Sequence, residues 1–379
     1  MTVRTTVVVA ATAVALTAGF AAPAMAAAGA DRHEGTRQAV RAAVQDGVPG
    51  VTLTAKDGRS TWSTTAGVGN LRTHAPRSAD DRYRVGSITK TFVSTVLLQL
   101  EAEGRLSLDD TVEKWLPGVV HGNGHDGSRI TVRQLLNHTS GIFNYTADET
   151  FGRTYFLKDG FFRHRYDTQT PRQLVAVAMG HKPDFAPGTS WNYSNTNYVV
   201  AGMVIQKVTG RSYGEEIRHR IIEPLHLRAT SVPGTRVTVP KPSSRAYSKL
   251  AQTATGPTYD VTELNPSLAS SAGEMISDSA DLDRFYAALL KGRLLPPRQL
   301  KEMKTTVTVE GIPNAGYGLG LIDRELSCGV HVWGHDGGIH GSSSVAVTTA
   351  DGRHSLAFNF NGDWSGDTDA VVEAEFCDE

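Results

Sequence analysis

The spacing of apolar residues divides the chain into strand-forming segments at its two ends and helix-forming segments between them. Near the N-terminus, helical spacing predicts a helix over residues 34–46, and alternation predicts two paired strands at 50–53 and 62–68. From Ser87 the apolar positions keep helical spacing as far as Gly104. This pattern predicts a largely buried helix with Ser87 in its first turn.

The middle of the chain, about residues 105–250, contains short helical patterns separated by Pro and Gly. A further helix is predicted at 282–291, and after it the pattern changes to short alternating or apolar segments that predict an antiparallel meander. The strands of this meander are predicted at residues 317–325, 329–333, 343–349 and 355–361. A last helix is predicted at 367–376.

Strands at both ends of a chain with a helical middle predict an α+β fold. We expect an antiparallel β-sheet flanked by helices, formed from N- and C-terminal segments, with an inserted mostly helical domain. The α/β part is placed at about 33–86 and 255–379, and the helical part at about 87–254. Together they form one predicted catalytic domain, residues 27–379.

Residues 1–26 have the features of a secretory signal peptide. Arg4 is followed by an apolar run and then by Ala24-Met25-Ala26, the small-x-small pattern that signal peptidase cleaves. A membrane anchor is the alternative, but the run is short and rich in Ala, and no second apolar stretch of spanning length follows. We therefore expect cleavage after Ala26 and a secreted, extracellular protein without a membrane anchor.

The composition is that of an ordinary globular protein, with 40% hydrophobic and 20% charged residues in 379. The net charge of −1 becomes −2 without the signal peptide, because Arg4 is its only charged residue. A basic balance that would indicate a nucleic-acid partner is absent. The polar run at 121–128 contains two histidines but no further metal ligands, so we expect an exposed loop, no metal and no cofactor.

The chain has two cysteines, Cys328 and Cys377. An even number of cysteines in an oxidising compartment favours pairing, so we predict one disulfide. Two buried thiols are the alternative.

The segment Arg84-Val-Gly-Ser-Ile-Thr-Lys90 places a hydroxyl and an amine one helical turn apart. Ser87 and Lys90, at positions i and i+3, lie on one face of a helix, so Ser87 could attack a substrate while Lys90 takes its proton. The alternative is that Ser87 is only a helix N-cap.

Two further segments carry candidate chemistry. Tyr193-Ser-Asn195 precedes a predicted helix; Tyr193 can relay a proton if nearby cations lower its pKa, and Asn195 offers an amide that holds Lys90 or a substrate carbonyl. His335 lies in Trp-Gly-His-Asp-Gly-Gly, residues 333–338, at the end of a predicted strand. Alone, a histidine between glycines is more often a turn residue than a catalyst.

In this order, Ser-x-x-Lys, Tyr-x-Asn and His-x-Gly resemble the motifs of penicillin-recognising serine enzymes. The chain resembles the secreted serine D-Ala-D-Ala carboxypeptidases of filamentous soil bacteria and, more broadly, class C β-lactamases and their esterase relatives, over nearly the whole mature chain. The segments that carry this likeness are residues 84–90, 130–134, 193–197, 317–321, 326–329 and 376–377.

The resemblance implies a β-lactamase/transpeptidase-like fold and a set of site residues. The implied catalytic residues are Ser87, Lys90 and Tyr193, and the implied substrate-binding residues are Asn195, His335, Gly337 and Gly338. Ser87 becomes acylated, Lys90 and Tyr193 share its proton, and the backbone N–H groups of Ser87 and Gly338 form the oxyanion hole. The dipole of a helix N-terminus and burial both disfavour a charged Lys90, which suits a base.

Two other segments match catalytic patterns but are predicted to be structural. Ser212 in Gly210-Arg-Ser-Tyr-Gly214 fits the nucleophile-elbow pattern, but a helix precedes it and Glu215 completes a capping box. His138-Thr-Ser-Gly141 follows a helix that begins at Thr131, and Gly141 suits the end of that helix.

The chain departs from its relatives on the leaving-group side. They carry His-Thr-Gly-Thr and an arginine after Gly-Leu-Gly-Leu, groups that bind the substrate carboxylate, where this chain has His335-Asp-Gly-Gly338 and Ile322. An inward Asp336 would add repulsion. Alternatively, Asp336 points to solvent and Arg324, on the same strand face as Ile322, replaces the missing cation.

The expected function is that of a secreted serine D-alanyl-D-alanine carboxypeptidase. Its partners would be small-molecule or peptidoglycan-peptide substrates, with β-lactam antibiotics as acylating ligands, and we expect a monomer. A β-lactamase, esterase or D-aminopeptidase of the same family is the alternative. An alternative of another class is a non-catalytic penicillin-binding or wall-sensing protein.

Overall fold

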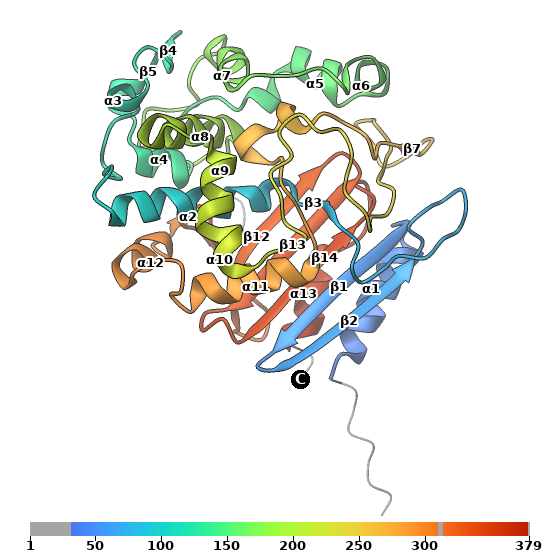
Figure 1. Cartoon of the computed structure of the whole chain (residues 1–379). Coiled ribbons are helices and arrows are strands. Elements are labelled where there is room, and N and C mark those ends of the chain that lie inside the picture. The colour runs from blue at the N-terminus through green and yellow to red at the C-terminus, as the bar shows by residue number, and fades with distance from the viewer. Residues whose placement is uncertain (1–31, 310–313, 378–379) are drawn as a thin grey trace, which may run out of the picture.

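The structure is a computed structural model that describes residues 32–309 and 314–377. The predicted signal peptide, residues 1–26, lies outside the described residues. Figure 1 shows a sheet built from blue N-terminal and red C-terminal strands, with a mostly helical part beside it. This arrangement confirms the predicted α+β fold.

The main sheet has eight strands in the order β2-β1-β14-β13-β12-β11-β10-β9, and every neighbouring pair is antiparallel. The strand bounds are β1 Gly50–Asp57, β2 Ser60–Gly67, β9 Val307–Thr308, β10 Ala315–Tyr317, β11 Ile322–Glu325, β12 His331–Ile339, β13 Ser342–Thr349 and β14 His354–Phe360. Val51 of β1 lies opposite Phe360 of β14. The two ends of the chain therefore share one sheet, as predicted.

The predicted single strand at 317–325 is wrong, because the chain turns within it. Gly320 has φ +71°, and a Cβ there would lie 2.7 Å from Tyr198 Oη, so the turn between β10 and β11 requires a glycine. The strand predicted at 329–333 is also too short. It continues through His335 to Ile339, because its glycines pair in the ladder like other residues.

Helices cover both faces of the sheet. α1 (Glu34–Gln45) and α13 (Thr368–Cys377) pack on one face in a separate apolar cluster, and α11 (Ser279–Leu290) packs on the other face against the larger core. Figure 1 shows α11 and α13 on opposite sides of the sheet. A disulfide joins Cys328 to Cys377, with Cα atoms 5.6 Å apart, and fastens α13 to the loop before β12.

The helical part is built around α2 (Thr89–Ala102), which is buried over most of its length. Its neighbour α8 (Asn195–Thr209) is also buried over most of its surface, and its left-handed C-cap is Gly210. The other helices are α3 Val112–Trp115, α4 Val132–Leu136, α5 Glu149–Tyr155, α6 Lys158–His164, α7 Pro171–Met179, α9 Tyr213–Ile217, α10 Glu223–Leu225 and α12 Pro297–Met303.

Short strands and single helical turns complete the chain. The strands are β3 Tyr83–Arg84, β4 His121–Gly122, β5 His125–Asp126, β6 Tyr247–Ser248, β7 Tyr259–Asp260 and β8 Ile276–Ser277. The turns are η1 Gly86–Ile88, η2 Gly127–Arg129, η3 Tyr145–Ala147, η4 Arg218–Ile222, η5 Pro266–Leu268 and η6 Ser270–Ala272. The polar run at 121–128 is therefore not a simple exposed loop, because His125 is buried.

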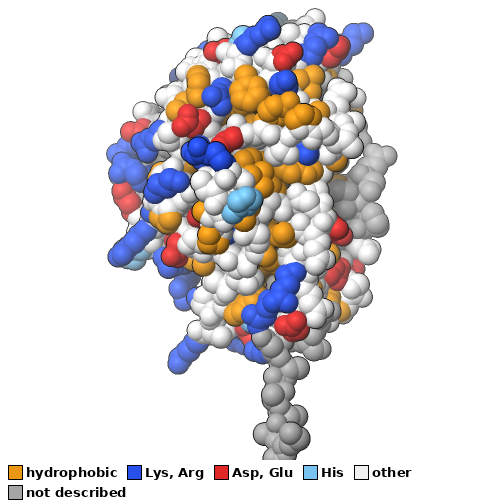
Figure 2. Space-filling model, turned by 90° about the vertical axis from the view of Figure 1, so that its right-hand side faces the viewer, with side chains coloured by type: hydrophobic (Ala, Val, Ile, Leu, Met, Phe, Trp, Pro, Cys, Tyr) orange, Lys and Arg blue, Asp and Glu red, His pale blue; other side chains and the backbone are white. Residues whose placement is uncertain are grey.

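The described surface carries charges of both signs. On the face shown in Figure 2, Lys and Arg side chains are interspersed with Asp and Glu side chains. In residues 32–309 and 314–377, no helix is both long enough and apolar enough to span a bilayer.

Candidate active site

Ser87 lies in the short turn η1, immediately before α2, where β12 crosses the chain. Gly86 has φ +53°, and a Cβ at this position would lie 2.7 Å from the Gly338 nitrogen. A Cβ at Gly337 would overlap Val85 O and lie 2.8 Å from the Ser87 nitrogen. Glycines at 86 and 337 therefore let β12 approach the backbone on either side of Ser87.

Lys90 is fully buried, and its Nζ lies 2.9 Å from Ser87 Oγ. The same nitrogen lies 2.8 Å from Asn195 Oδ1 and 2.7 Å from the backbone oxygen of Ala272. Burial holds the pKa of Lys90 well below its usual value, and the charge of Asp336 acts more weakly in the opposite direction. The amine is therefore neutral over a wider pH range than that of an exposed lysine.

The three contacts of the neutral amine fix its orientation. Asn195 Oδ1 and the Ala272 carbonyl can only accept hydrogen bonds, so they take the two N–H groups of the amine. The remaining lone pair then faces Ser87 Oγ, whose O–H donates to it. This geometry suits an amine that removes a proton from Ser87.

Tyr193 lies against the same amine, with Lys90 Nζ 4.8 Å from its ring centroid. Burial raises the pKa of Tyr193 well above its ordinary value, and a hydrogen bond with Ser87 opposes this rise. The expectation that cations lower the pKa of Tyr193 does not fit this arrangement, because the adjacent amine is neutral. Tyr193 therefore keeps its proton and is placed to donate it.

Asn195 is the first residue of α8, and hydrogen bonds hold its side chain and its backbone in place. Its Nδ2 donates to Thr146 Oγ1 at 3.2 Å, and its backbone N–H donates to Asn144 Oδ1 at 3.1 Å. Since Oδ1 accepts from Lys90, the amide oxygen is engaged by the amine. Asn144 and Thr146 have no motif that the sequence analysis could have used.

His335 is buried in β12, and both of its ring nitrogens are engaged. Nδ1 lies 2.5 Å from the backbone oxygen of Asp336, and Nε2 lies 2.9 Å from Tyr317 Oη. Burial lowers the pKa of His335 to about 4, so the ring is neutral near pH 7. Tyr317 and the Asp336 backbone thus engage both ring nitrogens, and substrate binding by His335 stays a prediction.

A cavity of about 630 Å³ opens beside Ser87. Among the described residues, its wall includes Ser87, Asn195 and Gly338 but not His335. The rest of the wall is mixed: Tyr145, Phe156, Leu250, Leu268, Ile339 and Trp364 are apolar or aromatic, while Lys249, Gln252, His340 and Asp363 are polar or charged. Ser87 and Gly338 both line this cavity, so their backbone N–H groups remain the predicted oxyanion hole.

The residues expected to alter the leaving-group side lie together on one sheet face. Ile322, Arg324 and Asp336 line the same small depression. The Asp336 side chain is 61% exposed, so it points to solvent, and Arg324 pairs with Asp369 of α13. The relatives have an arginine at the position of Ile322. Arg324 does not replace it, because Arg324 is paired with Asp369.

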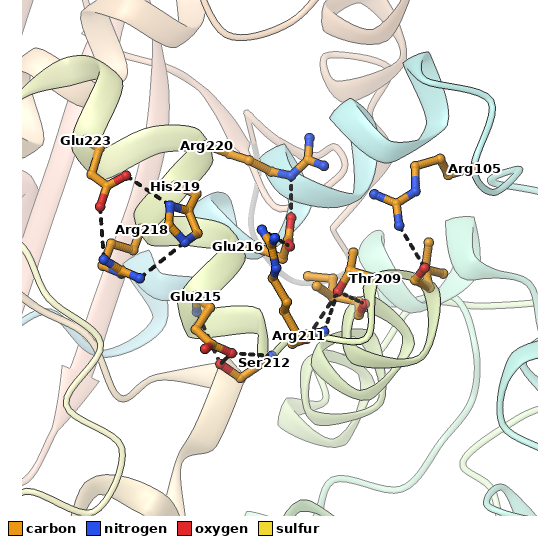
Figure 3. Close-up of polar contacts among 12 residues, drawn as sticks. Arg105, Thr209, Arg211, Ser212, Glu215, Glu216, Arg218, His219, Arg220 and Glu223 are labelled. Carbon is orange, nitrogen blue, oxygen red and sulfur yellow. Dashed lines mark hydrogen bonds and ion pairs between the residues drawn. The ribbon is translucent and has the colours of Figure 1, made fainter.

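Ser212, the serine of the nucleophile-elbow pattern, is a helix cap, as predicted. Figure 3 shows it bound to Glu215, and its Oγ lies 2.8 Å from Glu215 Oε2 in a complete capping box. Around it, Glu216 and Glu223 bind cationic side chains of the same helical segment. Both partners of Ser212 Oγ, the Glu215 backbone N–H and the Glu215 carboxylate, belong to this cap.

Two residues near the site carried no assigned role in the sequence analysis. Tyr317 lies in a segment quoted for its resemblance alone, and His138 was predicted to be architectural. The centroids of the His138 and Tyr193 rings lie 4.3 Å apart, and His138 Nδ1 accepts a hydrogen bond from the Ser194 N–H. These contacts between distant segments form only in the folded chain. In the described ranges, no cluster of three His, Cys, Asp or Glu residues suits a metal ion.

The fold and the paired serine and lysine define the class of a serine hydrolase. The sequence profile of the Beta-lactamase family matches residues 31–374, and the chain belongs to this family. The structure of a D-stereospecific amidohydrolase from Streptomyces sp. is similar, with 65% identity, a TM-score of 0.88 and coverage of 92% of this chain and 99% of that chain.

Three further relatives are less similar to this chain. The structure of D-amino acid amidase from Ochrobactrum anthropi SV3, complexed with L-phenylalanine amide, is 29% identical, with a TM-score of 0.77 and coverage of 91% of this chain and 98% of that chain. Penicillin-binding protein 4* of Bacillus subtilis (strain 168) is 25% identical over 332 residues, which are 82% of this chain and 68% of that protein. Protein flp of Staphylococcus aureus (strain COL) is 30% identical over 71% of this chain, which spans only 51% of flp.

Proposed function

We propose that this protein is a D-stereospecific amidohydrolase that cleaves amides of D-amino acids through an acyl-enzyme on Ser87. The observation that carries the proposal is the 65% identity, over 92% of the chain, to a D-stereospecific amidohydrolase. The arrangement of Ser87, Lys90, Tyr193 and Asn195 supports it, because it supplies a nucleophile, a neutral base and a proton donor in contact.

In the first half of the reaction, Lys90 takes the proton of Ser87 as Oγ attacks the substrate carbonyl carbon. The carbonyl oxygen becomes an oxyanion and binds the N–H groups of Ser87 and Gly338. Tyr193 then donates its proton to the leaving amine, and the Lys90 ammonium restores that proton. The C–N bond breaks, and Ser87 carries the acyl group as an ester.

In the second half, water replaces the amine. Lys90 takes a proton from water as the oxygen attacks the ester, and the same oxyanion hole holds the second tetrahedral intermediate. Its collapse returns the proton to Ser87 Oγ and releases the acid. The net reaction consumes one water and leaves every protein group in its starting protonation state.

The apolar part of the cavity wall can receive a bulky apolar side chain on the acyl side. Tyr145, Phe156, Leu268 and Ile339 contribute apolar wall, and burying such a side chain is worth about 1.5–3 kcal/mol. Ser87 lies in the wall of the same cavity, so an acyl group on its Oγ would extend directly into it.

The depression lined by Ile322, Arg324 and Asp336 shares no lining residue with the cavity beside Ser87. These three residues therefore carry no argument about a substrate carboxylate in that cavity, whose own wall includes the cation of Lys249. The choice of amides over free acids rests on the similarity to the D-stereospecific amidohydrolase.

A D-alanyl-D-alanine carboxypeptidase is the second candidate, and the relationship to penicillin-binding protein 4* supports it. In that case β-lactam antibiotics would acylate Ser87, since they mimic the peptide in this chemistry. Secretion after cleavage of residues 1–26 and a monomeric state complete the proposal.

The test compares kcat/KM for D-phenylalanine amide, L-phenylalanine amide, acyl-D-Ala-D-Ala and its C-terminal amide, with Ser87→Ala as the inactive control. We expect the D-amide to exceed the L-amide by about 100-fold or more, as a shaped pocket allows. A strong preference for the free acid acyl-D-Ala-D-Ala would replace the amidohydrolase with the carboxypeptidase. Equal rates for the D- and L-amides would contradict D-specificity.

A further inference from the structure

We infer that His138, in the segment His-Thr-Ser-Gly, is a positioning residue that holds Tyr193 and, through Tyr317 and His335, the strand that carries the oxyanion hole. The inference rests on the proposed role of Ser87 as nucleophile. It concerns a residue that lies outside the Ser-x-x-Lys, Tyr-x-Asn and His-x-Gly motifs.

His138 fastens the segment that carries Tyr193 at two points. Its backbone oxygen accepts from the Asn192 N–H at 3.2 Å, and its Nδ1 accepts from the Ser194 N–H at 3.2 Å. Asn197 Nδ2 donates to the same Nδ1 at 3.1 Å. The imidazole ring also lies against the Tyr193 ring, with centroids 4.3 Å apart. The residues on both sides of Tyr193 are therefore bound to His138.

These contacts determine which nitrogen of His138 carries the proton. Nδ1 accepts from two N–H groups, so the proton lies on Nε2, which donates to Tyr317 Oη at 3.2 Å. Tyr317 has one O–H, and it donates to His335 Nε2 at 2.9 Å. The Nδ1–H of His335 then donates to the Asp336 backbone oxygen. His138, Tyr317 and His335 thus form a row of hydrogen bonds that ends at the Asp336 backbone oxygen. Each side chain in this row donates once, and the donors all point from His138 toward β12.

The row requires the imidazole rings of His138 and His335 to stay neutral. Burial lowers the pKa of His138 well below its ordinary value, and the neighbouring Lys90 and His335 act in the same direction. Proton gain at Nδ1 of His138 would replace two accepted hydrogen bonds with repulsion between donors. His138 and Tyr317 are both buried, where an unmatched polar group is costly.

The backbone of His138 is also constrained. It has φ +63°, a left-handed conformation that residues other than glycine seldom adopt. The surrounding structure holds this conformation and thereby directs the ring between Tyr193 and Tyr317.

The row links the two sides of the reaction site. One end holds the segment with Tyr193, the proton donor, and the other end holds β12, where Gly338 supplies an oxyanion N–H. His138 is not in the wall of the cavity as described, so its loss should slow the chemical step and leave substrate binding nearly unchanged. A misplacement of about 1 Å in such a site can cost about 100-fold in rate.

The experiment uses four variants: His138→Asn, His138→Gly, Tyr317→Phe and the double variant His138→Asn with Tyr317→Phe. Asn tolerates the left-handed backbone and keeps an acceptor near the position of Nδ1, but it cannot reach Tyr317. Gly adopts the same left-handed backbone but makes neither the hydrogen bonds of Nδ1 nor the hydrogen bond of Nε2 to Tyr317. The rate constant for labelling of Ser87 by a fluorophosphonate measures nucleophile activation, and kcat and KM for D-phenylalanine amide separate chemistry from binding.

We expect His138→Gly to slow labelling by about 100-fold and His138→Asn by about 10-fold, with KM changed by less than about threefold. The double variant should label no more slowly than Tyr317→Phe alone, because both changes break the same row. Melting temperatures show whether each variant is folded.

His125→Asn is the matched control, since His125 is another buried histidine of the helical part and faces Ala178 and His181. It should label at the unmodified rate. Multiplying effects in the double variant, or a His138→Gly protein that labels as fast as the control, would overturn the inference. Labelling does not depend on the substrate, so failure of the amidohydrolase proposal would appear separately, as normal labelling without D-amide turnover.

Discussion

At the scale of single residues, the protonation of Lys90 decides what the site can do. The sequence predicted a base from the i, i+3 spacing, and the structure supplies the reason, since the amine is buried and has two carbonyl acceptors in Asn195 and Ala272. Ala272 could not be found from the sequence, because it contributes only its backbone oxygen. The pKa of Tyr193 was also mispredicted, since no sequence pattern reports how deeply a phenol is buried.

Replacement of Lys90 by Met should remove the base and keep the buried volume. We expect kcat/KM for D-phenylalanine amide to fall by about 10²–10⁴-fold, the usual contribution of a positioned general base. Circular dichroism and the melting temperature should show a folded protein. A variant that keeps more than a tenth of the activity would exclude Lys90 as the base.

The pH dependence of kcat/KM should show an acid limb that reports Lys90. Activity requires the free amine, so it falls as the pH drops below the lowered pKa of Lys90 and is retained above it. The charge of Asp336 raises the pKa of Lys90, so Asp336→Asn should move this limb to lower pH. The shift should be small because Asp336 is 61% exposed and its charge is screened. A limb that moves to higher pH would contradict this assignment.

At the scale of elements, strand β12 was only half predicted, and it is the element that shapes the site. Alternation of apolar residues indicated its first half, but a strand that contains Gly334, Gly337 and Gly338 gives no such signal. Gly334 and Gly337 allow β12 to lie close to the backbone of neighbouring segments. Only the tertiary structure shows which segments these are. The helices α2 and α11 were predicted to within a few residues of their bounds, because apolar periodicity is a local property of the sequence.

A methyl group at Gly337 should separate β12 from Ser87. The Cβ of Gly337→Ala would overlap Val85 O and lie 2.8 Å from the Ser87 nitrogen, so one backbone must move. We expect about 100-fold lower kcat, since the oxyanion donors would no longer converge.

Gly152→Ala in α5 is the matched control, because its Cβ meets nothing within 4 Å. It should leave activity unchanged and stability equal or slightly higher, as Ala favours a helix. Equal activity of the two variants would show that the close approach of β12 is not required.

At the scale of the whole molecule, the sheet joins the two ends of the chain and the disulfide fastens the last helix to it. Cys328 and Cys377 are 49 residues apart, and closing a loop of this size stabilises a protein by about 4 kcal/mol in the chain-entropy treatment, an upper figure. Pairing was predictable from two cysteines and a signal peptide. The contact between α13 and the loop before β12 was not, because it depends on the packing of the complete sheet.

Cys328→Ser with Cys377→Ser should lower the melting temperature and leave kcat of the folded protein unchanged, since both residues lie outside the cavity wall as described. Thiol counting on the unreduced protein should find no free thiol. Two reactive thiols, or an unchanged melting temperature after reduction, would show that the bridge does not stabilise the protein.

The most direct test of the account is mass spectrometry of the enzyme quenched during turnover of D-phenylalanine amide. We predict a D-phenylalanyl ester on the peptide that contains Ser87, and no adduct in the Ser87→Ala protein. The adduct should be depleted in Tyr193→Phe, because this tyrosine donates the proton to the leaving amine in the step that forms the ester. An adduct on Ser212, or rapid turnover without any covalent intermediate, would contradict the account.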